Sequence, residues 1–119
     1  MAALINDRTS AVVAENVELA ATRRQRRTGL LGRPSLDPAS AMLITPCCSV
    51  HTVFMQFPID VVFVDRGGRA VRLVHALPPW RMAAAMRAHS VIELAAGRLE
   101  ACGIQVGDRL YVSPQAETC

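Results

Sequence analysis

Ile59-Asp-Val-Val-Phe-Val64, followed by Asp65-Arg-Gly-Gly68 and then Ala70 to Leu77, is the stretch of sequence that decides the fold. Both flanks are rich in β-branched and aromatic residues, which favour strands. The paired glycines supply the positive φ that a tight turn needs, so an antiparallel hairpin is predicted. Side chains of a strand alternate between two faces, and we expect Ile59, Val61 and Phe63 on one face and Asp60, Val62 and Val64 on the other.

The sequence before the hairpin predicts further strands and one helix. Three segments have the composition of strands: Val17 to Ala20, Ala41 to Ile44 and Val50 to Gln56. Thr22-Arg-Arg-Gln25 has the form of a capping box, so a helix is expected to begin near Arg23. Gly32 is a natural C-terminal cap, which gives this helix a length of about nine residues.

The sequence after the hairpin predicts shorter elements. They are a short helix or structured loop from Arg81 to His89, a strand from Ser90 to Ala95, a helical turn from Gly97 to Gly103 and a final strand from Arg109 to Ser113. The chain is therefore predicted to be an α+β, mainly β domain of about six or seven short strands, arranged as a bent sheet or partly closed barrel. One N-terminal helix and one or two short helical turns complete it.

Length and composition favour one globular domain. The 119 residues are 51% hydrophobic and 19% charged, which suits a single soluble domain. We expect a partly flexible N-terminal segment over residues 1–16, the domain over 17–113 and a C-terminal tail over 114–119. Charged residues, prolines and histidines interrupt every apolar run before it reaches the roughly 18 residues of a membrane span. The N-terminus lacks the pattern of a signal peptide, so a cytoplasmic location is expected.

The net charge of the chain is only weak evidence for binding to an anionic polymer such as nucleic acid. The net charge is +3, and all 13 basic residues are arginines. Aromatic residues make up 4% of the chain, which is few for a stacking surface, so nucleic acid is an unlikely partner. An unidentified small molecule or protein is the expected partner, and the chain is expected to be a monomer or weak dimer.

The cysteines do not form the pattern of a disulfide framework. Cys47 and Cys48 are adjacent, Cys102 lies near the end of the domain and Cys119 is the last residue, so four reduced thiols are expected. Cys47, Cys48 and His51 are too few for a closed zinc site, and adjacent cysteines do not easily face one metal ion. The prediction is no metal and no cofactor.

Several short segments together resemble a known family. They are Gly29-Leu-Leu-Gly-Arg33, Ala41-Met-Leu43, Phe57-Pro-Ile-Asp60 through Phe63-Val-Asp65, and Val91-Ile-Glu-Leu-Ala-Ala-Gly97 with Gly103-Ile104 and Gly107-Asp108. Their order and spacing over residues 17–113 resemble the bacterial and archaeal family catalogued as domain of unknown function 192. The resemblance implies a small, mainly β domain with one early helix, and it implies no particular activity.

One segment departs from the family pattern. Many members carry Trp-Met-Lys-Asn-Thr where this chain has His51-Thr-Val-Phe-Met55. The chain therefore resembles a divergent branch, in which a Cys-x-x-x-His-Thr segment and Pro79-Trp-Arg81 form the local pattern. A role that the polar string has elsewhere does not transfer to these positions.

Asp60 is the most conspicuous polar residue in the predicted core. An ionised carboxylate among Pro, Ile, Val and Phe needs compensating partners. We favour a structural role in which backbone amides or an arginine such as Arg33 hold it, over a role as a polar anchor in a ligand cleft. A hydrolase that uses His51 with Asp60, and less readily Cys47 or Cys48 as nucleophile, is an alternative without a flanking catalytic signature.

Two further groups are candidate sites. Arg23, Arg24, Arg26 and Arg27 gather near a helix N-terminus and could bind an anion or a nucleic acid, although a solvated face is the simpler interpretation. Trp80 beside Arg81 is either a recognition aromatic or a lid over the core. The leading hypothesis is a non-catalytic binding or accessory module with no catalytic residue, whose cleft is formed by the His51 to Asp60 segment with these candidate binding residues: His51, Thr52, Asp60, Arg33, Trp80 and Arg81.

Overall fold

The computed structural model describes residues 2–114, which contain ten strands and two short helices. The strands are β1 (Ala2–Asn6), β2 (Ala11–Ala14), β3 (Asn16–Ala20), β4 (Ser40–Ile44), β5 (Ser49–His51), β6 (Ile59–Val64), β7 (Ala70–Leu77), β8 (Met82–Ala84), β9 (Ser90–Ala95) and β10 (Leu110–Pro114). The helices are α1 (Arg23–Thr28) and α2 (Arg98–Ala101). The mainly β class is confirmed, with more strands than the six or seven predicted.

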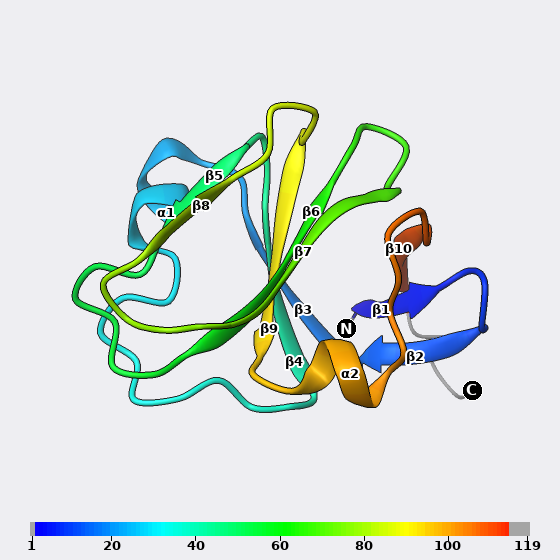
Figure 1. The fold of residues 1–119 in the computed structure, drawn as a ribbon, viewed down its shortest axis with the longest axis horizontal. Helices are drawn as coiled ribbons and strands as arrows, with labels where there is room; N and C mark the ends of the chain where they lie inside the picture. Colours follow the sequence, from blue (N-terminus) through cyan, green and yellow to red (C-terminus); the bar gives the residue numbers. More distant parts are fainter. Residues whose placement is uncertain (1, 115–119) are drawn as a thin grey trace.

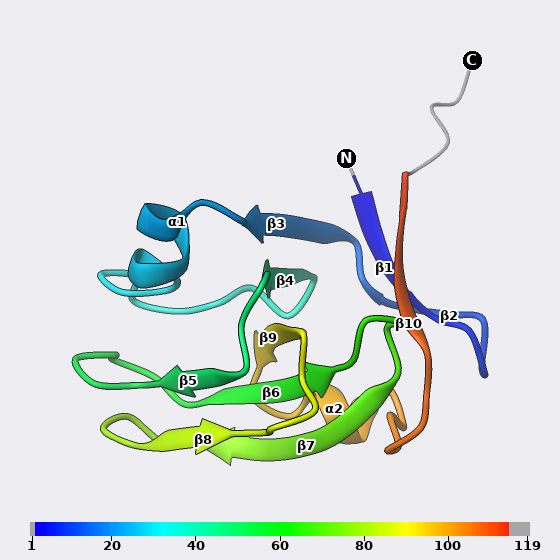
Figure 2. The same cartoon turned by 90° about the horizontal axis from the view of Figure 1, so that it is seen from above.

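Three sheets form the body of the molecule (Figures 1 and 2). The central sheet has the strand order β3-β4-β9-β6-β7, in which only the β3–β4 pair is parallel. A second sheet has the order β10-β1-β2, and β5 and β8 form a two-stranded ribbon. These sheets do not close into a barrel.

The predicted hairpin is present with the predicted bounds. β6 and β7 pair antiparallel from Ile59 opposite Leu77 to Val64 opposite Ala70. In the turn, the Asp65 side chain accepts hydrogen bonds from the amides of Gly67 and Arg69, at 2.9 and 3.0 Å. Gly68 has φ +83°, and a Cβ there would lie 2.6 Å from the Leu110 carbonyl oxygen. Glycine is therefore required where this turn approaches β10.

The two faces of the central sheet have separate cores. Ile59, Val61 and Phe63 pack with Val91 and Met42 on the face that β5, β8 and α1 cover. Val62, Val64, Ile92 and Leu94 pack on the other face with Leu4, Val13 and Leu99, which come from β1, β2 and α2. The predicted alternation of β6 is confirmed, because each set of side chains belongs to its own core.

Two expected elements are wrong. The strand predicted from Val50 to Gln56 is reduced to the three residues of β5, because the amide and hydroxyl of Thr52 bond to the 78–81 loop and Phe54 takes a positive φ of 66°. The expected helix or loop from Arg81 to His89 contains β8 instead. Pairing with β5 and burial of Ala83 override the helical preference of its alanines.

The predicted helix begins where expected and ends early. The Thr22 side chain accepts a bond from the Gln25 amide, and the Gln25 side chain accepts one from the Thr22 amide, which confirms the capping box. The helix ends at Thr28 rather than near Gly32, because Gly29 takes φ +47° while its amide bonds to the Gln25 carbonyl. The other predicted strands and the turn from Gly97 to Gly103 lie within about a residue or two of their observed elements.

Residues 2–14 form strands that the sequence did not predict. β1 pairs with both β2 and β10, which places the two described ends of the chain side by side. Buried Asp108 stabilises this sheet, because its carboxylate accepts hydrogen bonds from Asn6 Nδ2 at 2.9 Å, Arg8 Nε at 2.6 Å and the Gln105 amide at 2.9 Å.

Within the described range, no helix combines the length and the apolar character needed to cross a membrane.

Candidate functional site

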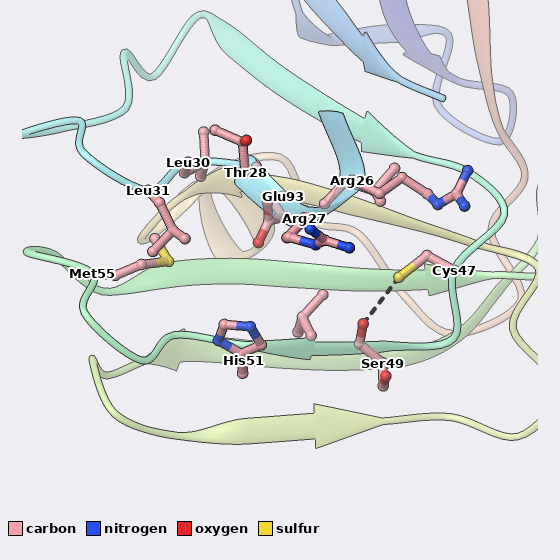
Figure 3. Close-up of a pocket in the computed structure, with 13 residues that line it drawn as sticks. Arg26, Arg27, Thr28, Leu30, Leu31, Cys47, Ser49, His51, Met55 and Glu93 are labelled. Carbon is pink, nitrogen blue, oxygen red and sulfur yellow. Dashed lines mark hydrogen bonds between the residues drawn. The ribbon is translucent and has the colours of Figure 1, made fainter. Parts of the chain in front are cut away.

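A small cavity lies between the C-terminal end of α1, the central sheet and β5 (Figure 3). Its volume is about 70 Å³. We call it the Glu93 cavity, and the lining residues that matter chemically are Arg26, Arg27, Leu30, Leu31, Cys47, His51, Met55 and Glu93. The two arginines come from α1, His51 from β5 and Glu93 from β9, so the cavity joins segments that are far apart in the sequence.

Glu93 is the buried acid of this cavity. It lies opposite Met42 of β4 and Val61 of β6, both members of the core under α1, and it is 3% exposed. No residue in the described part of the chain donates a hydrogen bond to its carboxylate. Burial raises its pKa from 4.5 to about 7, and the positive charge of Arg33 opposes this rise. Near neutral pH the group is therefore divided between a carboxylate and a neutral acid that can donate a hydrogen bond.

The end of α1 brings backbone close to this acid. A Cβ at Gly29 would lie 3.8 Å from Glu93 Oε1, so the helix cap forms part of the wall above the carboxyl group. Met55 is buried beside Leu31 on one side of the cavity (Figure 3). The wall is thus apolar at Leu31 and Met55, while Thr28, Cys47 and Ser49 add polar groups elsewhere.

The mouth of the cavity is basic. Arg27 is exposed and its guanidinium lies over the space beside Glu93, while Arg26 is half-buried on the side of Cys47 (Figure 3). His51 is exposed on the opposite wall. Two fixed positive charges and an imidazole therefore surround a single acid that is partly neutral at pH 7. This arrangement favours a small anion over a cation.

Cys47 lines the cavity as a thiol. Burial raises its pKa above 9.0, and the nearby Arg26 charge only partly offsets this. Its sulfur donates a hydrogen bond to the Ser49 carbonyl at 2.9 Å. A thiol that stays protonated at neutral pH is a poor nucleophile.

Asp60 lies on the other side of the central sheet. It is fully buried, and its carboxylate accepts hydrogen bonds from the amides of Ala76 at 2.7 Å, Gly97 at 3.0 Å and Leu99 at 2.9 Å. Of the two kinds of partner expected from the sequence, the structure has the backbone amides. Arg33 instead pairs with Glu18 at 2.7 Å, so the expectation of an Arg33–Asp60 contact is wrong.

Thr52, Trp80 and Arg81 form a separate cluster at the loops beside β5 and β8. The buried Thr52 hydroxyl lies 2.6 Å from the Pro78 carbonyl and accepts a bond from the Arg81 amide at 2.8 Å. The six candidate binding residues thus lie in four places rather than one cleft. Only His51 of that set lines the Glu93 cavity, together with Arg26 and Arg27 of the arginine group.

Glu93 was not among the site residues predicted from the sequence. The available signal was a single acid inside the apolar strand Ser90 to Ala95, with no neighbour in sequence to compensate its charge. Cys47, Cys48 and Cys102 are free thiols, and Cys119 lies outside the described residues. Within residues 2–114, no three His, Cys, Asp or Glu side chains gather in a way that could hold a metal ion.

Comparisons with known proteins agree on family and fold. The model of the DUF192 family, described as "Uncharacterized ACR", matches residues 4–112. A UPF0127 protein of Pyrococcus furiosus is 41% identical over 63 residues, which are 52% of this chain and about half (53%) of that relative.

Two solved structures share the fold. One is a protein of unknown function from Novosphingobium aromaticivorans, with TM-score 0.79 and 21% identity over 92% of this chain and 82% of that one. The other, described as a candidate transcription regulator of Sinorhizobium meliloti, has TM-score 0.80 and 24% identity over 93% and 91%. With the family match extending over nearly all the described strands, this chain belongs to the DUF192 family.

Proposed function

We propose that this chain is a non-catalytic binding domain that holds a small anionic group in the Glu93 cavity. The observation that carries the proposal is a glutamate that is 3% exposed, lines a cavity and has no hydrogen-bond donor to its carboxyl group among the described residues. Buried polar groups in folded proteins are almost always paired. A buried polar group without a partner in the protein is expected to bind a ligand or an ordered water molecule.

Charge selects the anion. Arg26 and Arg27 at the mouth repel a cation and attract a carboxylate or an oxyanion, to which a guanidinium donates paired hydrogen bonds. The neutral form of Glu93 can donate a further hydrogen bond to the anion from the buried side of the cavity, whereas its ionised form repels the same anion. Binding is therefore expected to take up a proton and to strengthen as the pH falls through 7.

The cavity size limits the ligand. A volume of about 70 Å³ is roughly five times the minimum space for one water molecule, which suits one carboxylate or one tetrahedral oxyanion. A larger metabolite or a peptide can place only one carboxylate or oxyanion inside the cavity. The rest of that ligand would lie outside, against Arg27 and His51. Leu31 and Met55 offer apolar contact to the part that follows the anionic group.

The arrangement supports binding over hydrolysis. His51 and Asp60 belong to opposite sides of the central sheet, so Asp60 is not available to orient the imidazole. The raised pKa of Cys47 leaves the neighbouring sulfur as a thiol. A nucleophile, a base and an orienting acid in one place would be needed for the hydrolase alternative.

Amide chemical-shift mapping of the full chain with sodium acetate and sodium sulfate tests the proposal, against chloride at equal ionic strength. We expect saturable shifts at Gly29, Cys47 and Glu93 that are stronger at pH 6 than at pH 8. Arg27→Gln should weaken binding by at least about ten-fold, the loss of one charge-assisted contact. Arg23→Gln is the matched control on the same helix, because Arg23 does not line the cavity.

Glu93→Gln separates hydrogen bonding from charge. The carboxamide keeps a donor below the anion, so binding should persist while its dependence on pH between 6 and 8 disappears. Equal effects of Arg23→Gln and Arg27→Gln would show only diffuse attraction to basic residues, and shifts confined to other parts of the chain would refute the site.

A further inference from the structure

Two loops at one end of the molecule display aromatic side chains to solvent. Phe54 is 72% exposed and Trp80 is 57% exposed, and their ring centroids lie 4.7 Å apart in an edge-to-face arrangement. They come from the loop between β5 and β6 and the loop between β7 and β8. Met82, at the start of β8, adds a third exposed apolar side chain. A Trp80 ring that covers the core is one of the two roles predicted from the sequence, but the ring is largely exposed.

The fold holds these side chains outward at a conformational cost. Phe54 and Trp80 have φ angles of 66° and 65°, a region that bulky residues rarely adopt. Buried Thr52 maintains both: its carbonyl accepts bonds from the amides of Met55 and Trp80, at 3.0 and 2.9 Å, and its amide donates to the Arg81 carbonyl at 2.8 Å. Strain maintained by a hydrogen-bonded clamp is a feature of functional positions.

The same end of the molecule carries more basic than acidic side chains. Figures 1 and 2 both place α1 and the two loops there. Arg27 of α1 and Met55 of the β5–β6 loop line the same cavity, and the Trp80 amide of the β7–β8 loop donates to the Thr52 carbonyl. Two acids lie beside α1: Glu18 lines a pocket with Arg24 and pairs with Arg33, and the buried Glu93 shares its cavity with Arg26 and Arg27. The acids between them in sequence are Asp37, Asp60 and Asp65. Asp60 is fully buried, and Asp65 lies in the turn at the other end of the β6–β7 hairpin. Within residues 2–114, neither Arg81 nor any arginine of α1 forms an ion pair with an acidic side chain.

We propose that Phe54 and Trp80 anchor this end of the molecule in the interface of an anionic lipid bilayer, with Arg81 and the α1 arginines facing the headgroups. Aromatic rings prefer the headgroup region, and basic side chains around them are attracted to acidic lipids. The exposed area of the two rings is roughly 250 Å², well below the ~800 Å² per partner of a stable protein interface. Two exposed aromatic rings beside arginines that form no ion pair suit a lipid headgroup region, into which the rings insert only a short way.

The lipid surface is a different partner from the small anion of the Glu93 cavity, and the two can be tested separately. Trp80 is the sole tryptophan of the chain, so its intrinsic fluorescence reports on this end of the molecule without labelling. Full-length protein is titrated with vesicles of phosphatidylcholine alone and with vesicles of phosphatidylcholine and phosphatidylglycerol at 3:1. We expect a blue shift of Trp80 emission, and its quenching by brominated acyl chains, with the anionic vesicles only.

Phe54→Ser tests the anchor while leaving Trp80 as the probe. The variant should lower partitioning into anionic vesicles by at least about ten-fold, as expected from removing one exposed aromatic side chain. Val106→Ser is the matched control, because Val106 is 63% exposed in a loop outside this end, and it should partition like the parent. Absence of a Trp80 shift would overturn the proposal, as would sedimentation with vesicles that leaves Trp80 emission unchanged, since that result would mean adsorption through arginines alone. Equal partitioning of Phe54→Ser and the parent would also overturn it.

Discussion

Two buried carboxyl groups on adjacent strands, Asp60 and Glu93, have opposite surroundings. Asp60 receives three backbone amides from β7 and the α2 region, which satisfy an ionised carboxylate. Glu93 receives no hydrogen bond from the described residues, and burial raises its pKa to about 7. The difference follows from the face of the sheet that each side chain occupies. We therefore expect Asp60 to stabilise the fold, and we propose that Glu93 contacts a ligand.

Asp60→Ala should lower the free energy of unfolding. The substitution leaves the amides of Ala76, Gly97 and Leu99 without their acceptor, at a cost of about 1–3 kcal/mol. His51→Ala is the comparison, and it should cost less because His51 is exposed. Urea unfolding of the parent and both variants measures the difference. An Asp60→Ala protein as stable as the parent would contradict the structural role.

Glu93 should make stability depend on pH near neutrality. Its pKa of about 7 in the folded protein exceeds the ordinary 4.5, so the folded state binds the proton more tightly. The resulting stability is complete below pH 4.5 and is lost as the pH rises through 7, by an amount of about 3 kcal/mol. Urea unfolding between pH 5 and pH 8 should show this decline in the parent and not in Glu93→Gln. Parallel profiles for the two proteins would contradict the raised pKa.

At the scale of elements, the sequence predicted those that its local signals determine. β6, β7 and β9 have the predicted bounds, because each is a β-rich run between turn residues or glycines. β8 was missed because Ala83 and Ala84 carry no strand signal, and only pairing with β5 makes them extended. The early end of α1 at Gly29 was missed because Gly32 is an equally good cap in sequence. β1 and β2 depend on β10, which lies about a hundred residues away.

Only separate parts of the candidate site were predicted, because the contacts that join them are long-range and leave no local signal in the sequence. The basic cluster and His51 were visible as residue types, but their meeting with Glu93 depends on how α1 and β5 lie over the central sheet. A single Glu in an apolar strand gives no indication of whether backbone amides will reach it. Asp60 was identified as buried because apolar residues surround it in sequence. Its partners come from β7 and the α2 region, whose position only the fold provides.

The sheet formed by β1, β2 and β10 should depend on Asp108. Its carboxylate accepts bonds from Asn6, Arg8 and the Gln105 amide, and the Arg8 side chain lowers its pKa to about 2. This stability is present above pH 3.8 and is lost as the pH falls through 2. Asp108→Ala should cost about 1–3 kcal/mol at pH 7 and increase hydrogen exchange in β1 first. Uniform exchange across all three sheets would show that Asp108 does not fasten this one.

At the scale of the whole molecule, the central sheet separates two sets of polar groups. On the side of α2, Asp60 is satisfied by backbone amides, and Asp108 fastens the adjoining sheet of β1, β2 and β10 with its own hydrogen bonds. On the side of α1 and β5, the polar groups of the Glu93 cavity remain open to a ligand, and the exposed aromatic rings lie at the same end. We infer that one side of the sheet maintains the fold while the other side binds.

The pKa of Glu93, measured in the full chain with and without an anion, tests this account most directly. Carbon-13 NMR of the labelled side-chain carboxyl follows the titration from pH 5.5 to 8.5, in chloride and in acetate or sulfate at equal ionic strength. The account predicts a midpoint of about 7 in chloride. A bound anion should shift it upward, because a neighbouring negative charge favours the neutral acid. A midpoint near 4.5, or one that neither acetate nor sulfate moves, would contradict the account.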